Sequence, residues 1–311
     1  DGEAASDYSG RPVSLSSNGT ILAIGAYGND GNGTDSGHVR VYEYDGSSWS
    51  QKGSDIDGEA ASDNSGYSVS LSSDGTIVAI GAIKNDGNGT DSGHVRVYEY
   101  SGSSWSQLGA DIDGEAAGDY NGVSVSLSSD GTIIAIGALH NDAGGVSAGH
   151  CRIYQYSRSS WSQLGQDIDG EAANDYHGRA VSLSPDGTTV AISSINNDNY
   201  LNNAGLVRIY KIDKATNLNV DGNLVVSGNI KGTGISNQSN WSQLGSDIDG
   251  EAAGDESGIS VSLSSDGTIV AIGADANDEN GSNSGHVRVY KYSSGGSWSQ
   301  LGADINGSGV N

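Results

Sequence analysis

An acidic loop with the pattern D-G-E-A-A-x-D recurs five times along the chain, beginning at residues 1, 57, 113, 169 and 249. In the second copy it carries three carboxylates, Asp57, Glu59 and Asp63. Calcium binds hard oxygen ligands from flexible loops, so these residues are a candidate calcium site, although their spacing is not that of an EF-hand. The alternative is that the carboxylates cap turns and pair with strand arginines, which need acidic partners when buried. Those arginines are Arg40, Arg96, Arg152, Arg208 and Arg288.

A second polar loop carries an aspartate at one fixed offset in every copy, at positions 30, 86, 142, 198 and 278. In the first two copies the loop reads N-D-G-N-G-T-D, which is rich in oxygen ligands and is a second candidate calcium site. Its candidate ligands are Asp30, Asn32 and Asp35 in the first copy and Asp86, Asn88 and Asp91 in the second. The alternative is an Asx turn that stabilises the loop.

Histidines and tryptophans also keep fixed positions. His38, His94, His150 and His286 share one position, which Leu206 takes in the fourth copy. A zinc site needs converging ligands, and histidines on different repeats are not expected to meet, so we expect them to be hydrogen-bonded at strand ends. The tryptophans are candidate ligand-binding residues that could stack on sugars, with packing between repeats as the alternative. They are Trp49, Trp105, Trp161, Trp241 and Trp298.

The repetition of these polar residues argues against catalysis. An active site needs different groups with separated pKa values at one place, whereas here nearly every polar residue occurs five times in equivalent settings. The sequence shows neither a nucleophile-and-base arrangement nor a phosphate-binding glycine loop followed by a helix. We therefore predict that the protein is not an enzyme and that calcium is its one candidate cofactor.

These side chains are positioned by a repeat of 56 residues, which lengthens to 80 in the fourth copy through an insertion of 80 − 56 = 24 residues. In the second copy, residues 67–72 alternate apolar and polar side chains, and residues 76–82 form a short apolar run. The first pattern predicts a half-buried strand and the second a strand buried on both faces. Ser73-Asp74-Gly75 predicts the tight turn between them. Residues 94–100 and 104–109 are predicted to form two further strands.

Four short antiparallel strands per repeat indicate a propeller blade, because such a unit must stack on its neighbours to bury its faces. We predict one all-β domain over residues 1–311, a five-bladed β-propeller with four antiparallel strands per blade. The blades are placed at about 1–56, 57–112, 113–168, 169–248 and 249–305, with an inserted hairpin at about 214–240. An open solenoid is the main alternative.

The repeat resembles a known family. Its pattern G-x-S-V-S-L-S-S-D-G-T-I-V-A-I-G-A, followed by S-G-H-V-R-V-Y and W-S-Q-L-G, is similar to the FG-GAP repeats of integrin-α-like propellers and their bacterial and viral relatives. The resemblance implies a propeller that presents loops to a ligand, commonly with calcium and in adhesion. The Phe-Gly of the family is replaced here, for example by Ser65-Gly66. The family's calcium loop is reduced to Ser-Asp-Gly, which is too short to surround an ion needing six to eight oxygens.

Charge and composition restrict the partners. The formal net charge of −25 repels the phosphate backbone, so we expect no nucleic-acid partner. No apolar stretch has the length of a membrane span, so we expect no membrane insertion. The single cysteine, Cys151, takes the place of a valine in other copies and is expected to be buried without a disulfide.

From these observations we predict an extracellular, secreted, or virion- or cell-surface protein that mediates attachment without catalysis. It would recognise a glycan or a surface protein through its loops. Copies of itself in an assembly are the other predicted partner. The alternative function is a purely structural building block of a fibre, capsid decoration or surface layer, and a glycosidase-type enzyme is the third. The insertion could provide a unique contact or be a tolerated surface loop.

Overall fold

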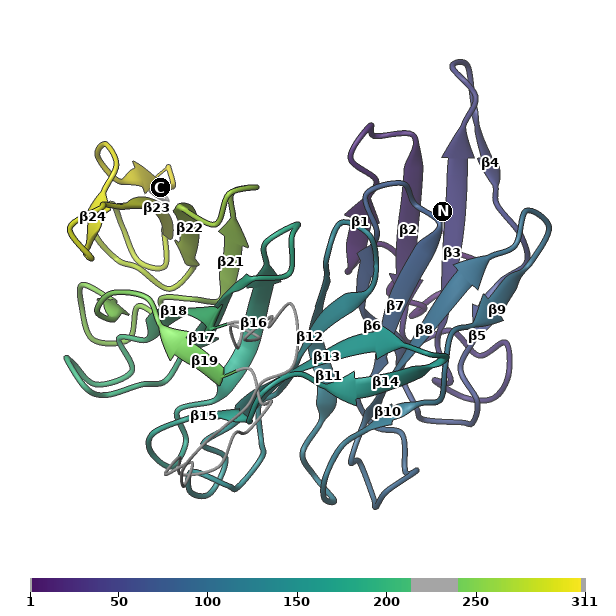
Figure 1. The fold of residues 1–311 in the computed structure, drawn as a ribbon, viewed down its shortest axis with the longest axis horizontal. Helices are drawn as coiled ribbons and strands as arrows, with labels where there is room; N and C mark the ends of the chain where they lie inside the picture. Colours follow the sequence, from purple (N-terminus) through teal and green to yellow (C-terminus); the bar gives the residue numbers. More distant parts are fainter. Residues whose placement is uncertain (1, 214–239, 309–311) are drawn as a thin grey trace, which may run out of the picture.

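The computed structural model describes residues 2–213 and 240–308. In these residues the backbone forms strands and turns without any helix, and the strands make five sheets in chain order (Figure 1). The prediction of an all-β, five-bladed propeller is therefore confirmed. The hairpin predicted at about 214–240 lies, apart from residue 240, outside the described residues. This part of the chain contains no helix that is long and apolar enough to cross a membrane.

Each sheet is built from one repeat. The first contains β1 (Val13–Leu15), β2 (Ile21–Ala26), β3 (His38–Tyr44), β4 (Trp49–Gln51) and β5 (Ile56–Asp57). The second contains β6 (Ser65–Leu71), β7 (Ile77–Ala82), β8 (His94–Tyr100), β9 (Trp105–Gln107) and β10 (Ile112–Asp113). The third contains β11 (Asn121–Leu127), β12 (Ile133–Ala138), β13 (His150–Ser157), β14 (Ser160–Gln163) and β15 (Ile168–Asp169).

The last two sheets repeat this order. The fourth contains β16 (His177–Leu183), β17 (Thr189–Ser194), β18 (Leu206–Asp213), β19 (Asn240–Gln243) and β20 (Ile248–Asp249). The fifth contains β21 (Ser260–Leu263), β22 (Ile269–Ala274), β23 (His286–Tyr292), β24 (Trp298–Gln300) and β25 (Ile305–Asn306).

The four predicted strands of each repeat are present, and the outermost one is interrupted. In the first sheet β1, β2, β3 and β4 pair in order and antiparallel, and β5 also pairs with β3. The later half of β3 pairs with β4, through Tyr42 and Gln51, while its start pairs with β5, through Val39 and Ile56. Since the repeat's fourth strand is thus split in two, the residues between its halves lie beside the start of the third strand.

The turn between the first two strands forms as the Ser-Asp-Gly sequence predicts. In the second repeat the Asp74 carboxylate accepts hydrogen bonds from the Thr76 amide at 3.0 Å and from the Ser72 hydroxyl at 2.7 Å. Gly75 has a φ of 69°, a left-handed conformation that favours glycine. The aspartate and glycine together therefore fix the hairpin.

The hydrophobic core lies between sheets. In one cluster, Ile21 and Val39 of the first sheet pack against Val78 and Ile80 of the second, with Trp105 at the margin. Three further clusters join the second sheet to the third, the third to the fourth and the fourth to the fifth. Cys151 is completely buried in this core as a free thiol, as expected. Each blade therefore depends on its neighbours for burial, as a blade of low apolar content must.

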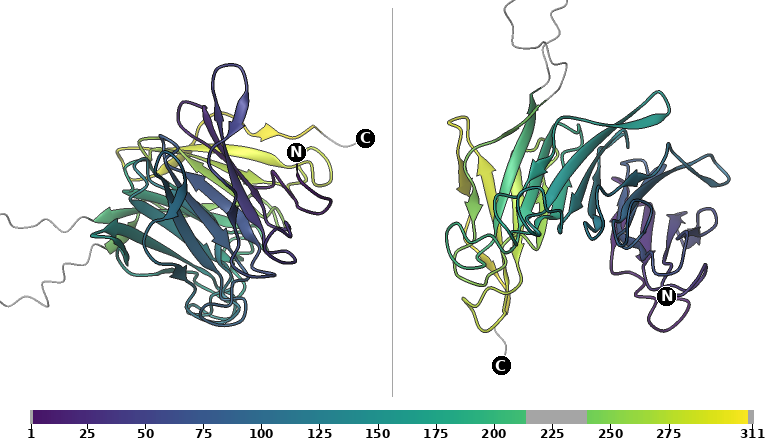
Figure 2. Two further views of the ribbon diagram at one scale, coloured as in Figure 1. Left: turned by 90° about the vertical axis from the view of Figure 1, so that its right-hand side faces the viewer. Right: turned by 90° about the horizontal axis from the view of Figure 1, so that it is seen from below.

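The five sheets follow one another along an arc. In the right-hand view of Figure 2, the purple first sheet and the yellow fifth sheet lie on opposite sides of a gap. No hydrophobic cluster of the described residues joins these two sheets. The first and fifth blades therefore each pack against one neighbour, whereas the three inner blades pack against two.

Candidate functional site

Each repeat except the fourth brings a glutamate, a histidine and an aspartate together at one edge of its sheet. In the first repeat Glu3 comes from the acidic loop, His38 begins β3, and Asp55 lies between the two halves of the outer strand. Pairing of β5 with the start of β3 holds this aspartate beside the histidine, with 3.7 Å between the Asp55 Oδ2 and His38 Nδ1 atoms. The equivalent groups are Glu59, His94 and Asp111, and Glu115, His150 and Asp167.

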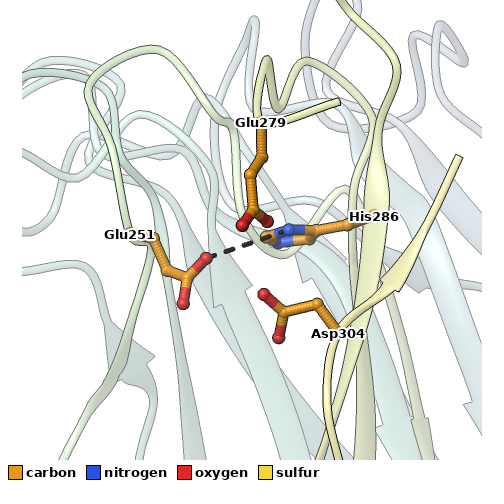
Figure 3. A group of neighbouring side chains, drawn as sticks. All are labelled: Glu251, Glu279, His286 and Asp304. Carbon is orange, nitrogen blue, oxygen red and sulfur yellow. Dashed lines mark ion pairs between the residues drawn. The ribbon is translucent and has the colours of Figure 1, made fainter. Parts of the chain in front are cut away.

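The fifth repeat has the largest of these groups, with Glu251, Glu279, His286 and Asp304. Figure 3 shows the three carboxylates pointing toward the edge of the His286 ring from different segments. Each residue offers one ligand atom, and these atoms all lie within 4.8 Å of one another. Glu279 is the additional carboxylate, and it occupies the loop position held in the other repeats by Gly31, Gly87, Ala143 and Asn199.

The histidines of these groups are buried, and three of them have a ring nitrogen without a hydrogen-bond partner among the described residues. His286 is 5% exposed and His150 is fully buried, and the Nδ1 atom of each has no partner among the described residues. The His94 Nε2 atom is also buried without a partner. Buried polar atoms are nearly always hydrogen-bonded in native proteins, so unpartnered nitrogens facing carboxylates indicate a ligand position.

The distances between ring nitrogens and carboxylates exceed those of hydrogen bonds. His286 Nδ1 lies 3.9 Å from Glu251 Oε2, and His150 Nδ1 lies 3.8 Å from Glu115 Oε2. Two ligand atoms at about 2.1 Å from a tetrahedral ion lie about 3.4 Å apart. The two atoms are therefore close to the separation at which both would bind one metal ion.

An arginine two residues after each histidine orients the glutamate. Arg288 Nη1 lies 3.2 Å from Glu251 Oε1, while the other oxygen of this carboxylate faces His286. Arg152 and Glu115 divide the carboxylate oxygens in the same way. Outer partners of this kind fix the orientation of metal ligands. The predicted pairing of acidic-loop glutamates with strand arginines is thus confirmed. In these two repeats it leaves one glutamate oxygen unpaired with the arginine, and in the third repeat that oxygen also accepts from the Asn141 side chain at 3.4 Å.

The first and fourth repeats use their arginines differently. Arg40 donates to both oxygens of Asp55, at 3.0 and 2.9 Å, and also pairs with Glu3. Arg208 likewise donates to both oxygens of Asp247, at 2.9 and 2.8 Å, and pairs with Glu171. In the first repeat the guanidinium therefore already neutralises the carboxylates that lie beside His38. The fourth repeat, with Leu206 in place of histidine, has no Glu–His–Asp group among the described residues.

Burial determines the protonation of the imidazoles. Burial, together with a smaller effect of the adjacent arginine, lowers the pKa of His94 and of His150 to about 4. Burial is also the main cause that lowers the pKa of His38. Rings with such pKa values are neutral at pH 7 and keep a lone pair on nitrogen, which is the form that binds a metal ion.

The acidic-loop residues predicted to bind calcium do not converge on one another. Among the described residues, Glu59 belongs to a potential metal group, together with His94 and Asp111. Asp63 is buried, where it accepts hydrogen bonds from the Ala60 amide at 3.0 Å and the Asn85 side chain at 3.1 Å. Asp57 ends β5 with its carbonyl oxygen bonded to Arg96. Asp63 therefore caps a turn, and calcium binding by this trio stays a prediction.

The second polar loop is held by its own hydrogen bonds. Asp86 Oδ1 accepts from the Asp91 amide at 2.8 Å, and Asn88 donates to the carbonyl oxygen of Gly114 in the following repeat at 2.8 Å. The first repeat shows the same pattern, in which Asp30 accepts from the Asp35 amide and Asn32 donates to the carbonyl of Gly58. The loop does contain an Asx turn, but the preceding asparagine makes it: Asn85 Oδ1 accepts from the Gly87 amide at 2.8 Å, whereas the aspartate bond closes a longer turn. Calcium binding at this loop also stays a prediction.

Four of the five tryptophans connect neighbouring blades. The indole N–H groups of Trp105, Trp161, Trp241 and Trp298 donate to backbone carbonyls of Lys52, Leu108, Leu164 and Leu244 in the preceding blade, at 2.6 to 2.8 Å. All four also pack against the inter-sheet clusters. Trp49, in the first blade, is exposed and makes no such bond within the described residues. Packing is thus the role that the contacts show, and ligand binding by the five tryptophans stays a prediction.

Sequence reasoning missed the aspartate that completes each group. It lies two residues before the acidic loop in every copy, at Asp55, Asp111, Asp167, Asp247 and Asp304, the last before a partial sixth motif. The recurrence was visible, but the segment read as a connection between repeats. The sequence predicts that histidines of different repeats do not meet one another. The structure instead places each of four histidines beside carboxylates of its own repeat.

Comparison with known proteins identifies the repeat. The family model of the FG-GAP repeat matches residues 1–42, 54–98 and 248–290. Three of the five repeats match the FG-GAP repeat. No curated protein matches the sequence. Among solved structures, the periplasmic gluconolactonase of Pseudomonas aeruginosa matches with a TM-score of 0.53 and 15% identity, covering 94% of this chain and 70% of that one. A putative TolB from Agrobacterium tumefaciens matches with a TM-score of 0.47 and 14% identity, covering 96% and 82%.

These comparisons correct the predicted function. The prediction of a non-enzymatic attachment module, with a structural building block as its alternative, is wrong as an inference from this fold. A structure with the same fold is named as an enzyme, so repetition of the blades gives no reason to exclude catalysis. FG-GAP repeats by themselves also do not show that a protein binds glycans. At 15% identity the likeness shows the fold alone, and it assigns no reaction to this chain.

Proposed function

We propose that this FG-GAP repeat protein binds divalent transition-metal ions, of which zinc is the best probe, through its Glu–His–Asp groups. The observation that carries the proposal is the buried His286 Nδ1 atom, which has no hydrogen-bond partner among the described residues and lies 3.9 Å from Glu251 Oε2, in a group that also holds Glu279 and Asp304. One imidazole with several carboxylates is a ligand set that zinc and manganese accept. Calcium sites are built from oxygen ligands, so the imidazole favours a transition metal.

Charge ranks the sites. In the fifth repeat three carboxylates face one arginine, Arg288, so the group has a charge of 1 − 3 = −2 when His286 is neutral. The groups of the second and third repeats hold two carboxylates and one arginine each, a charge of 1 − 2 = −1, and in the third the Asp169 carboxylate lies 4.0 Å from His150 Nδ1 as a further neighbour. A divalent ion neutralises the fifth group completely. The tightest binding is therefore expected there, followed by the second and third repeats.

The first prediction concerns His286→Leu, which gives the fifth repeat the residue that the fourth repeat already has at this position. Metal-stripped protein is titrated with ZnCl2 by calorimetry. The wild type is expected to bind more than one equivalent, and the variant is expected to lose the tightest site, with affinity there falling about tenfold or more. A matched control is His140→Leu, since His140 is a partly buried histidine outside these groups that makes edge-to-face contacts with Tyr120 and Tyr176.

The outcomes are distinguishable. If the wild type binds no zinc, or if both variants bind it as the wild type does, the proposal is wrong. Titration with CaCl2 in the same series tests the calcium predicted at the polar loops, because His286→Leu leaves those loops intact. Thermal melting adds a second readout, since an ion at 100 times its Kd stabilises the native state by about 2.7 kcal/mol.

We assign no reaction to the chain, because four similar sites support binding and a fold shared at 15% identity does not extend to chemistry. A location outside the cytoplasm remains part of the proposal. It is supported by the word periplasmic in the name of the matched gluconolactonase and by the acidic surface. Export to the periplasm or medium in a cell-fractionation experiment would test it.

A further inference from the structure

The first blade exposes a face that the second, third and fourth blades bury. Leu15 on β1 is 57% exposed, whereas its equivalents Leu71, Leu127 and Leu183 are at most 8% exposed. Val13, beside it, is also exposed. The face continues into a hollow of about 260 Å³ lined by Leu22, Ile24, Tyr42 and Trp49, among others. In the inner blades the preceding blade covers the equivalent residues, whereas in the first blade no blade covers this face.

The fifth blade exposes the opposite face. Ile305 on β25 is 62% exposed, whereas its equivalent Ile56 is 5% exposed. Val287 on β23 is 37% exposed, although Val39 at the same position of the first blade is fully buried. A hollow of about 370 Å³ lies here and is lined in part by Val287, Ile305 and Gly307. In the inner blades this side is covered by the following blade.

The two exposed faces are the two halves of one interface that the chain builds four times. Within the chain, Ile56 and Val39 of one blade pack against Val78 and Ile80 of the next, with Tyr98 and Trp105 around them. Ile305 and Val287 are the equivalents of the first pair in the fifth blade. Leu22, Ile24, Tyr42 and Trp49 are the equivalents of the second set in the first blade.

The hydrogen-bonding groups at the two ends are complementary as well. Between inner blades the indole N–H of Trp161 donates to the carbonyl of Leu108, and the Ser126 hydroxyl accepts from the Leu183 amide. The first blade offers the donor Trp49, and the fifth offers the carbonyl of Leu301 and the hydroxyl of Ser262 at the matching positions. None of these three groups has its inter-blade partner within the described part of the chain.

We propose that these faces bind each other between two copies of this chain, with the first blade of one copy docked on the fifth blade of another. The structure favours a second copy of this chain as the binding partner. Every copy carries both halves of an interface that occurs four times between consecutive blades of the chain. The contact is heterologous, so it either closes a ring of copies or continues head to tail. Since each copy has a net charge of −25, added salt should strengthen the association by screening repulsion.

The second prediction tests this contact by sedimentation velocity at increasing protein concentration, in 0.5 M NaCl and with EDTA present so that a bridging metal ion is removed. The wild type is expected to associate. Leu15→Asp and Ile305→Asp each introduce a charge into one of the two faces, and each variant alone is expected to remain monomeric. A mixture of the two variants still has one intact face on each partner, so it is expected to stop at dimers. Val146→Asp, at an exposed loop position, is the matched control and should behave as the wild type.

Each result decides the proposal. A wild type that stays monomeric at all concentrations and in high salt overturns it, and so does equal loss of association in Val146→Asp. If the protein is monomeric and both Leu15→Asp and Ile305→Asp lower its melting temperature, the two faces close on each other within one chain, and the proposed contact between copies is wrong.

Discussion

The buried imidazoles determine how stability should depend on pH. Burial keeps His94 and His150 neutral, with pKa values of about 4 against an ordinary value of 6.5. Between these two values the unfolded chain binds a proton at each histidine and the native chain does not. The free energy of unfolding therefore falls as the pH falls from 6.5 toward 4, by up to about 1.4 kcal/mol per pH unit for each histidine.

The third prediction uses this sign. His150→Leu removes one such histidine and introduces the residue found at this position in the fourth repeat. In urea unfolding of metal-free protein, the loss of stability between pH 7 and pH 5 is expected to be smaller in the variant than in the wild type. Measurements at pH 8, where the histidine is neutral in the native and in the unfolded chain, give the difference in unfolding free energy between variant and wild type without the protonation effect. Identical pH profiles for the two proteins would contradict the assignment of a depressed pKa to His150.

At the residue scale, the sequence indicated the types of ligand but not their grouping. The acidic-loop glutamates and the strand arginines could be paired from composition, because a buried arginine needs a carboxylate. The convergence of Asp304 and Glu279 on His286 could not be predicted in this way. It depends on the interruption of the outer strand between β24 and β25 and on a glutamate at one loop position of the fifth repeat. Period-two patterning predicts which face a side chain occupies but not where a strand is interrupted.

At the scale of the element, the outer strand joins blades through one aromatic contact. The Trp161 ring packs on the cluster between the second and third sheets, and its N–H bonds to the Leu108 carbonyl at 2.7 Å. Trp49 occupies the same position in the first blade without a preceding blade. The same residue in the same strand is thus an inter-blade contact in one place and a surface side chain in the other.

The fourth prediction compares these two positions. Trp161→Phe keeps an aromatic ring but removes the N–H donor, so the free energy of unfolding is expected to fall by about 1 kcal/mol, the net value of a hydrogen bond. Trp49→Phe is expected to change it by less than about 0.5 kcal/mol, as surface substitutions usually do. Chemical denaturation of both variants provides the comparison. Equal losses would show that the bond to Leu108 contributes nothing specific.

The strands themselves were readable from the sequence. The run 76–82 is observed as β7, Ile77–Ala82, and the third strand was placed correctly at β8, His94–Tyr100. Turn chemistry at Asp74-Gly75 fixed the hairpin between the first two strands. The fourth strand predicted at 104–109 is observed as β9, whereas its continuation β10 lies outside the predicted range, since polar residues of low periodicity carry little information on pairing.

At the scale of the molecule, the hydrophobic pattern of the repeat does not predict whether the first and fifth blades meet. The repeat predicts that each blade needs a neighbour. The rotation from one blade to the next decides whether five blades complete a circle, and the alternation of side chains does not predict this rotation. The structure places the first and fifth sheets on opposite sides of a gap (Figure 2). Exposure of Leu15 and Ile305 is the direct consequence.

The fifth prediction follows from this arrangement and concerns hydrogen exchange. In an arc of blades each repeat is stabilised by its own contacts and by those with its neighbours, so repeats with one neighbour open more often than repeats with two. In dilute, metal-free protein the amides of β12 and β13 in the third blade are expected to exchange more slowly than those of β2 and β3 or of β22 and β23. Uniform protection across all five blades would contradict the open arc and indicate a closed, fully cooperative ring.

When the concentration is raised, protection should increase in the first and fifth blades alone, and Leu15→Asp should abolish this increase, because it removes one half of the interface through which the end blades acquire their second neighbour.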